Sequence, residues 1–307
     1  MYTKQIGKNL YLIDLETGNY KNFIGSYVLK TAKKIVLIET GPTNSVPNLL
    51  GGLAELKVNL KDIDTIAITH IHLDHGGGVG TLLKHLPNAK VLVHPKGVSH
   101  IVDPEKLWAS SQSVLGSVSV VFGKPEPVPQ DRIFSMTEGT IDLDDEGKLT
   151  VLETLGHASH NLSFHENFNN GIFSGDTAGT FFPEFNIVTP TSPPPFYLEA
   201  AIASLDKLIS CRPSALYYSH FGKADDAIRR LRGYRAQLLM WNTIVQNAVE
   251  QNKSFEQITE CVLAEDPLMN TISSFLRGHD IYSKTAIENS ICGFVEYAKK
   301  AQIKKTP

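Results

Sequence analysis

The densest group of metal-binding side chains in the 307-residue sequence lies in residues 69–78, which read THIHLDHGGG. His70, His72, Asp74 and His75 place four potential ligands within six residues. In an extended segment, residues i and i+2 point the same way, so His70 and His72 can reach one ion together. Asp74 and His75 stand where the chain turns toward a predicted helix and can face a neighbouring ion. Neutral imidazole suits zinc, iron and cobalt, and a carboxylate neutralises part of the metal charge.

Three later positions repeat the theme, because each is a metal-ligand type that directly follows a predicted strand. They are His157 after residues 149–155, Asp176 after residues 171–175, and His220 after residues 215–218. Each alone is typical of a turn residue or a core histidine. Together with the cluster, they provide enough ligands for two coordination shells.

The order and spacing of these residues resemble the metallo-β-lactamase superfamily, whose H-x-H-x-D-H motif stands here as residues 70–75. The resemblance covers about residues 5–222. It implies an α/β fold, the αβ/βα sandwich of two mixed β-sheets flanked by helices. It also implies a ligand set, in which His70, His72 and His157 hold one metal, Asp74, His75 and His220 hold the second, and Asp176 bridges both.

The implied cofactors are two divalent transition-metal ions per chain, with zinc the first choice and iron, cobalt or manganese as alternatives. Two such ions about 3.5–4 Å apart generate a hydroxide at neutral pH, which attacks a lactone or ester carbonyl. Asp74 is the expected catalytic residue, orienting the nucleophile and passing a proton to the leaving group. His160 is expected to support the metal ligands by contacting them, and not to bind metal itself. Glu39 fits a supporting role and a plain structural role equally well.

The favoured substrate is an acyl-homoserine lactone, which would make the protein a quorum-quenching lactonase. The alternatives are an acyl thioesterase of the glyoxalase II or acyl-CoA type, and a ligand-binding regulatory protein with incidental hydrolysis. Many lactonases carry Tyr three residues after the bridging Asp. That position is Gly179 here, which weakens the match and leaves Tyr197 or Tyr218 as replacements. An apolar acyl pocket is expected from Trp108, Phe181, Phe182, Phe185, Tyr197 and Tyr218.

The elements that must position these residues follow from local pattern. Strands are expected at residues 4–14, 23–30, 34–39, 64–69, 89–93, 139–143, 149–155, 161–165, 171–175 and 215–218. Helices are expected at residues 45–57, 77–86 and 197–209, a helical or irregular stretch at 95–124, and a loop at 180–196. Beyond residue 222 no strand is evident and three helices are expected. We therefore predict a catalytic domain over residues 1–222 and a helical extension over 223–307, as active-site cover or dimer contact.

Composition narrows the function classes. A net charge of −3 gives no electrostatic reason to expect nucleic acid or an anionic membrane as a partner. The partner expected is a small acyl lactone or thioester, with a possible homodimer through the C-terminal helices. The three cysteines are odd in number and lack C-x-x-C spacing, which favours a reducing cytoplasm. No apolar run approaches membrane-spanning length, and strand-like sequence follows the first residues with no signal peptide in view.

Overall fold

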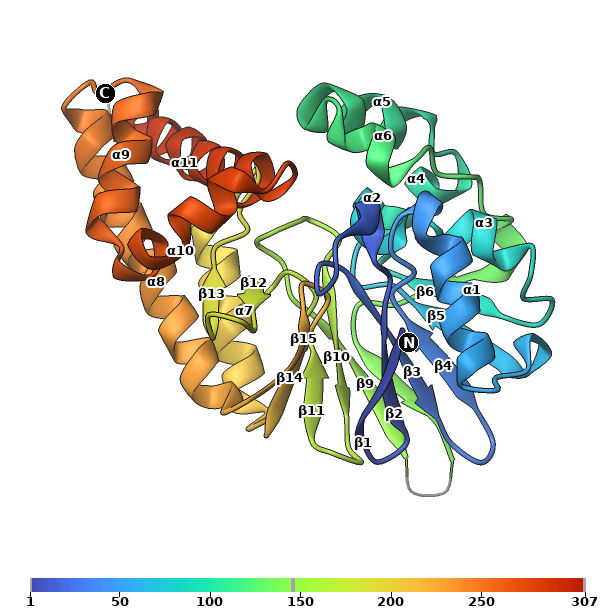
Figure 1. Cartoon of the computed structure of the whole chain (residues 1–307). Coiled ribbons are helices and arrows are strands. Elements are labelled where there is room, and N and C mark those ends of the chain that lie inside the picture. Colours follow the sequence, from blue (N-terminus) through green and yellow to red (C-terminus); the bar gives the residue numbers. More distant parts are fainter. Residues whose placement is uncertain (1, 145–146, 306–307) are drawn as a thin grey trace. The chain divides into compact units, whose positions relative to one another are not determined.

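The computed structural model describes residues 2–144 and 147–305, and its chain packs as two compact units (Figure 1). The first unit comprises Met1–Glu153, His160–Gly175 and Pro213–Asp225. The second comprises Thr154–Ser159, Asp176–Arg212 and Asp226–Pro307. Residues 1, 145, 146, 306 and 307 of these ranges lie outside the described part.

The first unit contains a seven-stranded sheet whose strands follow one another in sequence order. They are β1 (Thr3–Gly7), β2 (Leu10–Asp14), β3 (Gly25–Lys30), β4 (Ile35–Ile38), β5 (Ile63–Ala67), β6 (Lys90–Val93) and β7 (Ile133–Ser135). The pairs from β1 to β4 are antiparallel, and those from β4 to β7 are parallel. The sheet is therefore mixed, as predicted.

A six-stranded sheet in the same unit has the order β15-β14-β11-β10-β9-β8. Its strands are β8 (Gly139–Asp142), β9 (Lys148–Glu153), β10 (Leu162–Glu166), β11 (Gly171–Phe173), β14 (Ala215–Tyr218) and β15 (Gly222–Asp225). One pair, β11 with β14, is parallel and the other four are antiparallel, so this sheet is also mixed.

The two sheets share one hydrophobic core. Leu29, Val36 and Ala67 of the first sheet lie in the same buried cluster as Val151 and Phe164 of the second. Alternating strand residues point inward, so each sheet contributes one apolar face to this layer. The carboxyl ends of β5, β11 and β14 lead directly into residues of the predicted site.

The helices of the first unit are short apart from two. They are α1 (Val46–Glu55), α2 (Leu73–Gly76), α3 (Val79–Leu83), α4 (Val98–Val102), α5 (Glu105–Leu115) and α6 (Val118–Phe122). Helix α1 buries Leu49 and Leu53, which lie one turn apart, and α3 buries Leu82. Both helices lie on the outer side of the first sheet (Figure 1). The expected sandwich of two mixed sheets with helices outside is confirmed.

The second unit is mainly helical. Its helices are α7 (Leu198–Ser210), α8 (Ala227–Glu250), α9 (Phe255–Glu265), α10 (Pro267–Gly278) and α11 (Ser290–Lys305), with a π-helical segment at Ser283–Asn289. The long helix α8 contacts α7, α9 and α11. A small hairpin, β12 (Thr180–Phe182) with β13 (Ile187–Thr189), belongs to the same unit.

Several expectations about elements were wrong. Residues 4–14 form two paired strands, β1 and β2, with a turn at residues 8 and 9, and strand β7 was not predicted. The stretch 180–196 is not only a loop, since β12 and β13 pair there across a short turn. A strand, β15, begins at Gly222; its residues are poor β-formers, and its pairing with β14 creates it. Helix α10 was not predicted, although Asp266 and Pro267 form a recognisable helix start, the Asp266 side chain accepting from the backbone N–H of Leu268.

The predicted division at residue 222 remains a prediction. The compact units group residues by packing and place residues 154–159 and 176–212 with the C-terminal helices. Among the described residues, no helix is both long enough and apolar enough to cross a membrane.

Candidate metal centre

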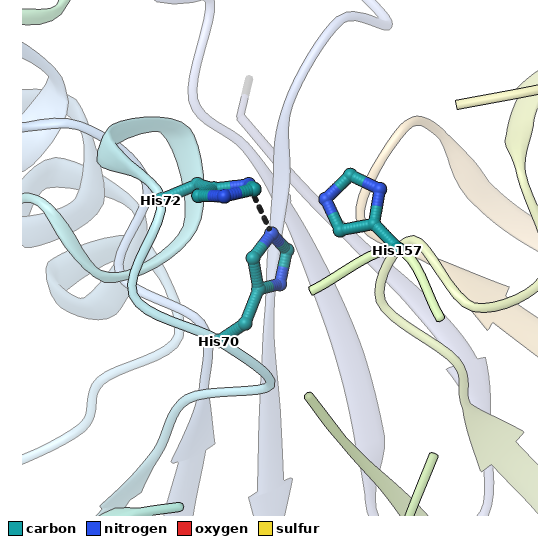
Figure 2. Close-up of side chains that lie close together, drawn as sticks. All are labelled: His70, His72 and His157. Carbon is teal, nitrogen blue, oxygen red and sulfur yellow. Dashed lines mark hydrogen bonds between the residues drawn. The ribbon is translucent and has the colours of Figure 1, made fainter. Parts of the chain in front are cut away.

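The motif histidines stand just past the end of β5, where the chain enters helix α2. The Nε2 atom of His70 lies 3.0 Å from the Nδ1 atom of His72 (Figure 2). Nδ1 of His70 in turn lies 3.0 Å from Oγ1 of Thr69. His70 is fully buried and His72 is partly exposed, so the pair is held by the protein yet reachable from outside.

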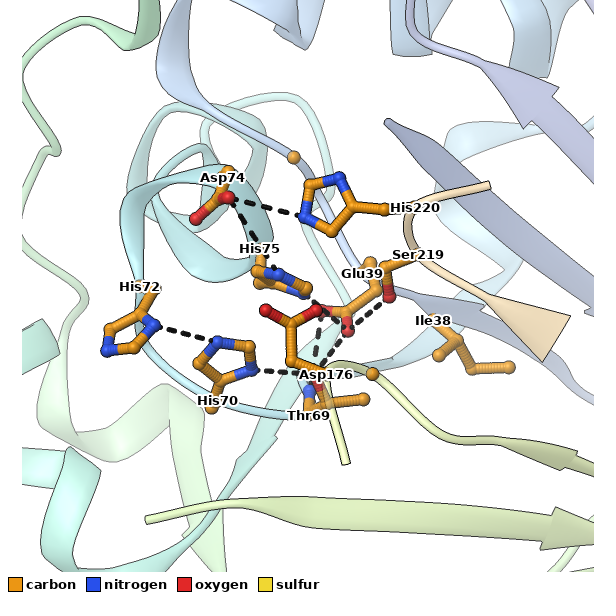
Figure 3. Close-up of polar contacts among 12 residues, drawn as sticks. Ile38, Glu39, Thr69, His70, His72, Asp74, His75, Asp176, Ser219 and His220 are labelled. Atoms are coloured by element: carbon orange, nitrogen blue, oxygen red, sulfur yellow. Dashed lines mark hydrogen bonds and ion pairs between the residues drawn. The ribbon is translucent and has the colours of Figure 1, made fainter. Parts of the chain in front are cut away.

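A second group joins Asp74 and His75 of helix α2 to His220, which follows β14. Each of the three offers one ligand atom within 4.8 Å of the others. Oδ2 of Asp74 lies 3.3 Å from Nε2 of His220 and 4.0 Å from Nε2 of His75 (Figure 3). His75 is completely buried, whereas the Asp74 side chain keeps 21% of its surface exposed. Residues 145 positions apart in sequence therefore meet in the first unit.

His220 is held from two sides by strand β3 and the segment before it. Its Nδ1 atom lies 3.0 Å from the carbonyl oxygen of Phe23. The Tyr27 hydroxyl donates a hydrogen bond to the carbonyl oxygen of Tyr218, two residues before His220. Burial, together with the nearby Tyr217 and the Glu39 carboxylate, holds the pKa of Tyr27 well above its usual value. The hydroxyl therefore stays protonated and keeps donating at any physiological pH.

Glu39 connects the two histidine-bearing segments. Its carboxylate lies 3.2 Å from Nδ1 of His75 and accepts a 3.1 Å hydrogen bond from the Ser219 hydroxyl. It also accepts from the backbone N–H and the hydroxyl of Thr69. These contacts radiate from one carboxylate in Figure 3. The side chain is 1% exposed. Of the two roles left open for Glu39, the geometry favours support of His75.

His160 lies beside the first two motif histidines. Its ring stacks on that of His70 at 6.3 Å between centroids and meets the His72 ring edge-on at 5.7 Å. This position suits a residue that packs against ligands, and its predicted supporting role stays a prediction.

The second unit holds the other two predicted ligands close together. Nε2 of His157 lies 3.4 Å from Oδ2 of Asp176, and both side chains are buried. Thr191 contacts both: its carbonyl oxygen lies 2.9 Å from Nδ1 of His157, and its hydroxyl donates to Oδ2 of Asp176 at 3.3 Å. Gly156 precedes His157 with a φ of 135°, and a Cβ there would lie 2.5 Å from Cα of Ala201. Only glycine fits this approach to α7.

The donor sets suit a transition-metal ion. In His75, His157 and His220 the Nδ1 atom faces a carboxylate or carbonyl oxygen, which places the proton on Nδ1. The Nε2 atom then has its lone pair available to bind a metal ion. Ligand atoms about 2.0–2.2 Å from a tetrahedral zinc ion lie roughly 3.3–3.6 Å from one another. The separations of 3.0 and 3.3 Å given above are close to that spacing. The residues therefore fit the group that the fold family implies.

The predicted pocket residues are dispersed over both units. Trp108 lies half-buried on α5, and Tyr218 is completely buried in β14. Phe181 and Phe182 are buried in β12, with the Arg230 guanidinium 4.8 Å from the Phe181 ring centre. Phe185 and Tyr197 are 39% and 51% exposed, so among these six they offer the most surface to a ligand. Their assignment to an acyl pocket stays a prediction.

Gly179 has no room for a larger side chain. Its φ is 84°, and a Cβ there would lie 2.6 Å from the carbonyl oxygen of Thr189 and 2.8 Å from the ring of Tyr234. A tyrosine at this position, as many lactonases have, does not fit this backbone. Sequence reasoning missed Thr191 and Tyr234, and no motif signal marks either residue.

Comparison with known proteins gives a consistent picture. A family model described as the metallo-beta-lactamase superfamily matches residues 22–220. A metallo-beta-lactamase fold-containing protein of Sulfurisphaera tokodaii is 31% identical over 201 residues, which are 64% of this chain and 72% of that protein. The crystal structure of an archaeal metallo-beta-lactamase superfamily protein from Sulfolobus tokodaii superposes with a TM-score of 0.70 at 24% identity, covering 95% of this chain and 100% of that one. The exodeoxyribonuclease WalJ of Streptococcus pneumoniae is 32% identical over 126 residues, 40% of each chain.

Proposed function

This chain belongs to the metallo-β-lactamase superfamily, and from that membership we propose that it is a metal-dependent hydrolase that opens an acyl lactone. One observation carries the proposal of a two-metal site. Asp74, His75 and His220 gather three ligand atoms within 4.8 Å, beside a separate His70–His72 pair. A site for a single ion would need only one of these two groups.

The proposed ligand set uses all seven predicted residues. His70, His72 and His157 hold one ion, Asp74, His75 and His220 hold the other, and Asp176 bridges them. The support is the family membership together with the ligand groups found in each unit. Zinc is the proposed ion because a set rich in imidazole and containing carboxylates matches its preference.

Two such ions, when bound, supply an activated water and a Lewis acid for the carbonyl. The protein must then orient the nucleophile and deliver a proton to the leaving oxygen. Asp74 suits this role because its carboxylate faces His220 at 3.3 Å while 21% of its side chain stays exposed. Glu39, at 1% exposure, is too deeply buried to meet a substrate and instead orients His75.

The substrate proposal is a lactone with an apolar acyl group. It draws on the exposed rings of Phe185 and Tyr197, which can contact an acyl chain. Because Gly179 excludes a tyrosine, a lactone carbonyl would have to be polarised without one there. An acyl thioester requires the same attack on carbon and is the matched alternative.

A phosphodiester is the second candidate function. The similarity to an exodeoxyribonuclease over 126 residues favours it, because the same pair of ions can serve phosphoryl chemistry. The net charge of −3 disfavours it, since nucleic-acid binding depends largely on a basic surface.

A side-by-side assay on zinc-reconstituted protein tests the proposal. The substrates are acyl-homoserine lactones of several chain lengths, acyl-CoA and S-lactoylglutathione thioesters, and a single-stranded DNA oligonucleotide. We expect lactone turnover that disappears on chelation and falls by about 100-fold or more in Asp74→Asn. Turnover of only the thioesters or only the DNA would overturn the lactonase proposal and select the corresponding alternative. Full activity in metal-free protein would refute the metal-dependent mechanism altogether.

The ligand set is tested separately by zinc content. Wild-type protein should retain close to two ions per chain after dialysis, and Asp176→Ala should retain far fewer. His160→Ala is the matched control, because His160 packs against ligand rings in the proposed site without binding metal. Equal zinc loss in both variants would show that the proposed shells are wrong.

A further inference from the structure

Thr191 contacts both predicted ligands of the second unit and also a residue of helix α8, each through a different atom. Its carbonyl oxygen lies 2.9 Å from Nδ1 of His157, and its hydroxyl donates to Oδ2 of Asp176 at 3.3 Å. Its backbone N–H donates to the hydroxyl oxygen of Tyr234 in α8 at 3.4 Å. We propose that Thr191 is the positioning residue for His157 and Asp176, and that helices α8 and α11 hold it in place. This inference rests on the proposed metal site.

The first step concerns His157. A carbonyl oxygen can only accept, so its contact with Nδ1 selects the tautomer that carries the proton on Nδ1. The Nε2 lone pair is then available to an ion, and the ring is fixed in orientation. Such outer contacts commonly change metal affinity by about 10- to 100-fold when removed.

The second step concerns Asp176. Its Oδ2 atom accepts from the Thr191 hydroxyl while lying 3.4 Å from Nε2 of His157. A carboxylate that bridged two ions would need a fixed orientation, because rotation about its terminal bond would move its oxygens away from them. The hydroxyl restrains that rotation, and therefore one residue sets the orientation of an imidazole and a carboxylate together.

The third step concerns what holds Thr191. Ser290, the first residue of α11, forms hydrogen bonds with Pro190 and Ser192, the two neighbours of Thr191. The Ser290 hydroxyl donates to the carbonyl oxygen of Pro190 at 2.9 Å and accepts from the N–H of Ser192 at 3.3 Å. The Ser192 hydroxyl donates back to the carbonyl oxygen of Ser290 at 3.2 Å. Ser192 and Ser290 are completely buried, so water does not compete for these bonds.

Close packing locks the same contact. A Cβ at Gly293, one turn into α11, would lie only 1.8 Å from the carbonyl oxygen of Ser192. Helix α11 thus approaches residues 190–192 as closely as a glycine permits. The C-terminal helices therefore act on the metal ligands through Thr191, besides any role as a cover or a dimer contact.

The test measures zinc itself, by competition with a chromophoric chelator. Thr191→Val keeps the side-chain shape and the carbonyl oxygen but loses the hydroxyl, and Thr191→Ser restores it. We expect Thr191→Val to bind the more weakly held zinc about 10- to 100-fold less tightly, with Thr191→Ser near wild type. Thr243→Val is the matched control. Among the contacts of the described residues, the Thr243 hydroxyl donates only to the carbonyl oxygen of Leu239, one turn earlier in α8. The cobalt-substituted protein gives a second readout, because a reoriented ligand changes its visible spectrum.

The outcomes separate this inference from the proposed function. If wild-type protein binds no zinc, the proposed function fails. If wild-type protein binds two ions and Thr191→Val shows the same affinity and cobalt spectrum, the positioning role is refuted while the metal site stands. Should Thr191→Val fail to fold by circular dichroism, Ser290→Ala takes its place. The Ser290→Ala variant leaves Thr191 intact. It must weaken zinc binding if α11 acts through Thr191, and unchanged zinc binding would contradict the inference.

Discussion

At the end of β4, Glu39 combines a left-handed backbone conformation, with φ at 65°, and a buried carboxylate that accepts hydrogen bonds. The groups facing it are the Thr69 N–H and hydroxyl, the Ser219 hydroxyl and Nδ1 of His75. A conformation that L-residues rarely adopt persists only where its surroundings enforce it. Here the enforcing contacts are the ones that orient a predicted ligand.

The Glu39→Gln variant should lose both stability and zinc affinity. An amide has one acceptor oxygen, so its NH₂ group must face at least one of the donors and leaves it unsatisfied. We expect the free energy of unfolding in urea to fall by about 1–3 kcal/mol in metal-free protein. We also expect zinc affinity to fall by about 10- to 100-fold, because His75 loses its partner.

A matched control separates the two effects. Glu166, the last residue of β10, is also completely buried and accepts from the N–H of Gly171 in β11 and the hydroxyl of Tyr217 in β14. Glu166→Gln should cost similar stability without changing zinc affinity. If both variants bind zinc like wild type, Glu39 is a structural residue only.

At the scale of the elements, helix α11 packs against residues 190–192, where Thr191 contacts the predicted ligands His157 and Asp176. Gly293→Ala should push it away from Ser192, because the added Cβ has only 1.8 Å to the carbonyl oxygen. We expect a loss of about 1–3 kcal/mol in unfolding free energy, measured by urea denaturation. Gly233→Ala on α8, where a Cβ would meet nothing within 4 Å, should instead gain about 0.5–1 kcal/mol.

The two glycines form a strict comparison, since both lie inside helices of the second unit. Equal effects would mean that the contact between α11 and residues 190–192 is looser than described. Zinc affinity measured on the same samples should fall for Gly293→Ala alone.

The segment after α10 carries a pH-sensitive residue. Burial lowers the pKa of His279, against a smaller opposing effect of Asp280. Its Nδ1 atom accepts from the N–H groups of Ile281 and Tyr282, which only an unprotonated nitrogen can do. Below about pH 6.5, His279 is therefore protonated in the unfolded chain while it stays neutral in the folded chain. Stability from this group is present above that pH and is lost as the pH falls toward the folded pKa.

We expect His279→Asn to flatten this dependence. The asparagine oxygen can replace Nδ1 as acceptor but does not titrate. Urea unfolding of the metal-free proteins between pH 8 and pH 5 should show wild type losing more stability than the variant. Parallel curves would remove His279 as the cause.

How far sequence predicts structure depends on the range of the interactions that create each element. Strands β3 to β5 are predictable because their own apolar β-formers determine them. Strand β15 has the residues Gly-Lys-Ala-Asp and exists through its pairing with β14, which no local pattern encodes. The motif of residues 70–75 was visible because its ligands are adjacent in sequence. Thr191 was not, since its partners lie 15 and 34 residues away and include a backbone carbonyl.

At the scale of the whole molecule, metal removal should lower the stability of the protein. In the proposed site, zinc would bind the folded chain far better than the unfolded one, so a concentration 1,000-fold above the dissociation constant should add about 4 kcal/mol. Calorimetry should show a clearly higher Tm with zinc than after dialysis against EDTA, and Asp176→Ala should shift much less. A Tm that ignores zinc would contradict the proposed site.

The sequential order of the first sheet, β1 through β7, has a consequence for synthesis on the ribosome. Each strand after β1 pairs with the strand that precedes it in sequence, so the sheet can form strand by strand as the nascent chain leaves the ribosome. Residues 70–75 are then exposed early, long before His157, Asp176 and His220 are translated. A free ion captured at that moment would meet an incomplete set of ligands. With the proposed ligand set, tight metal binding therefore has to wait until His220 has been translated.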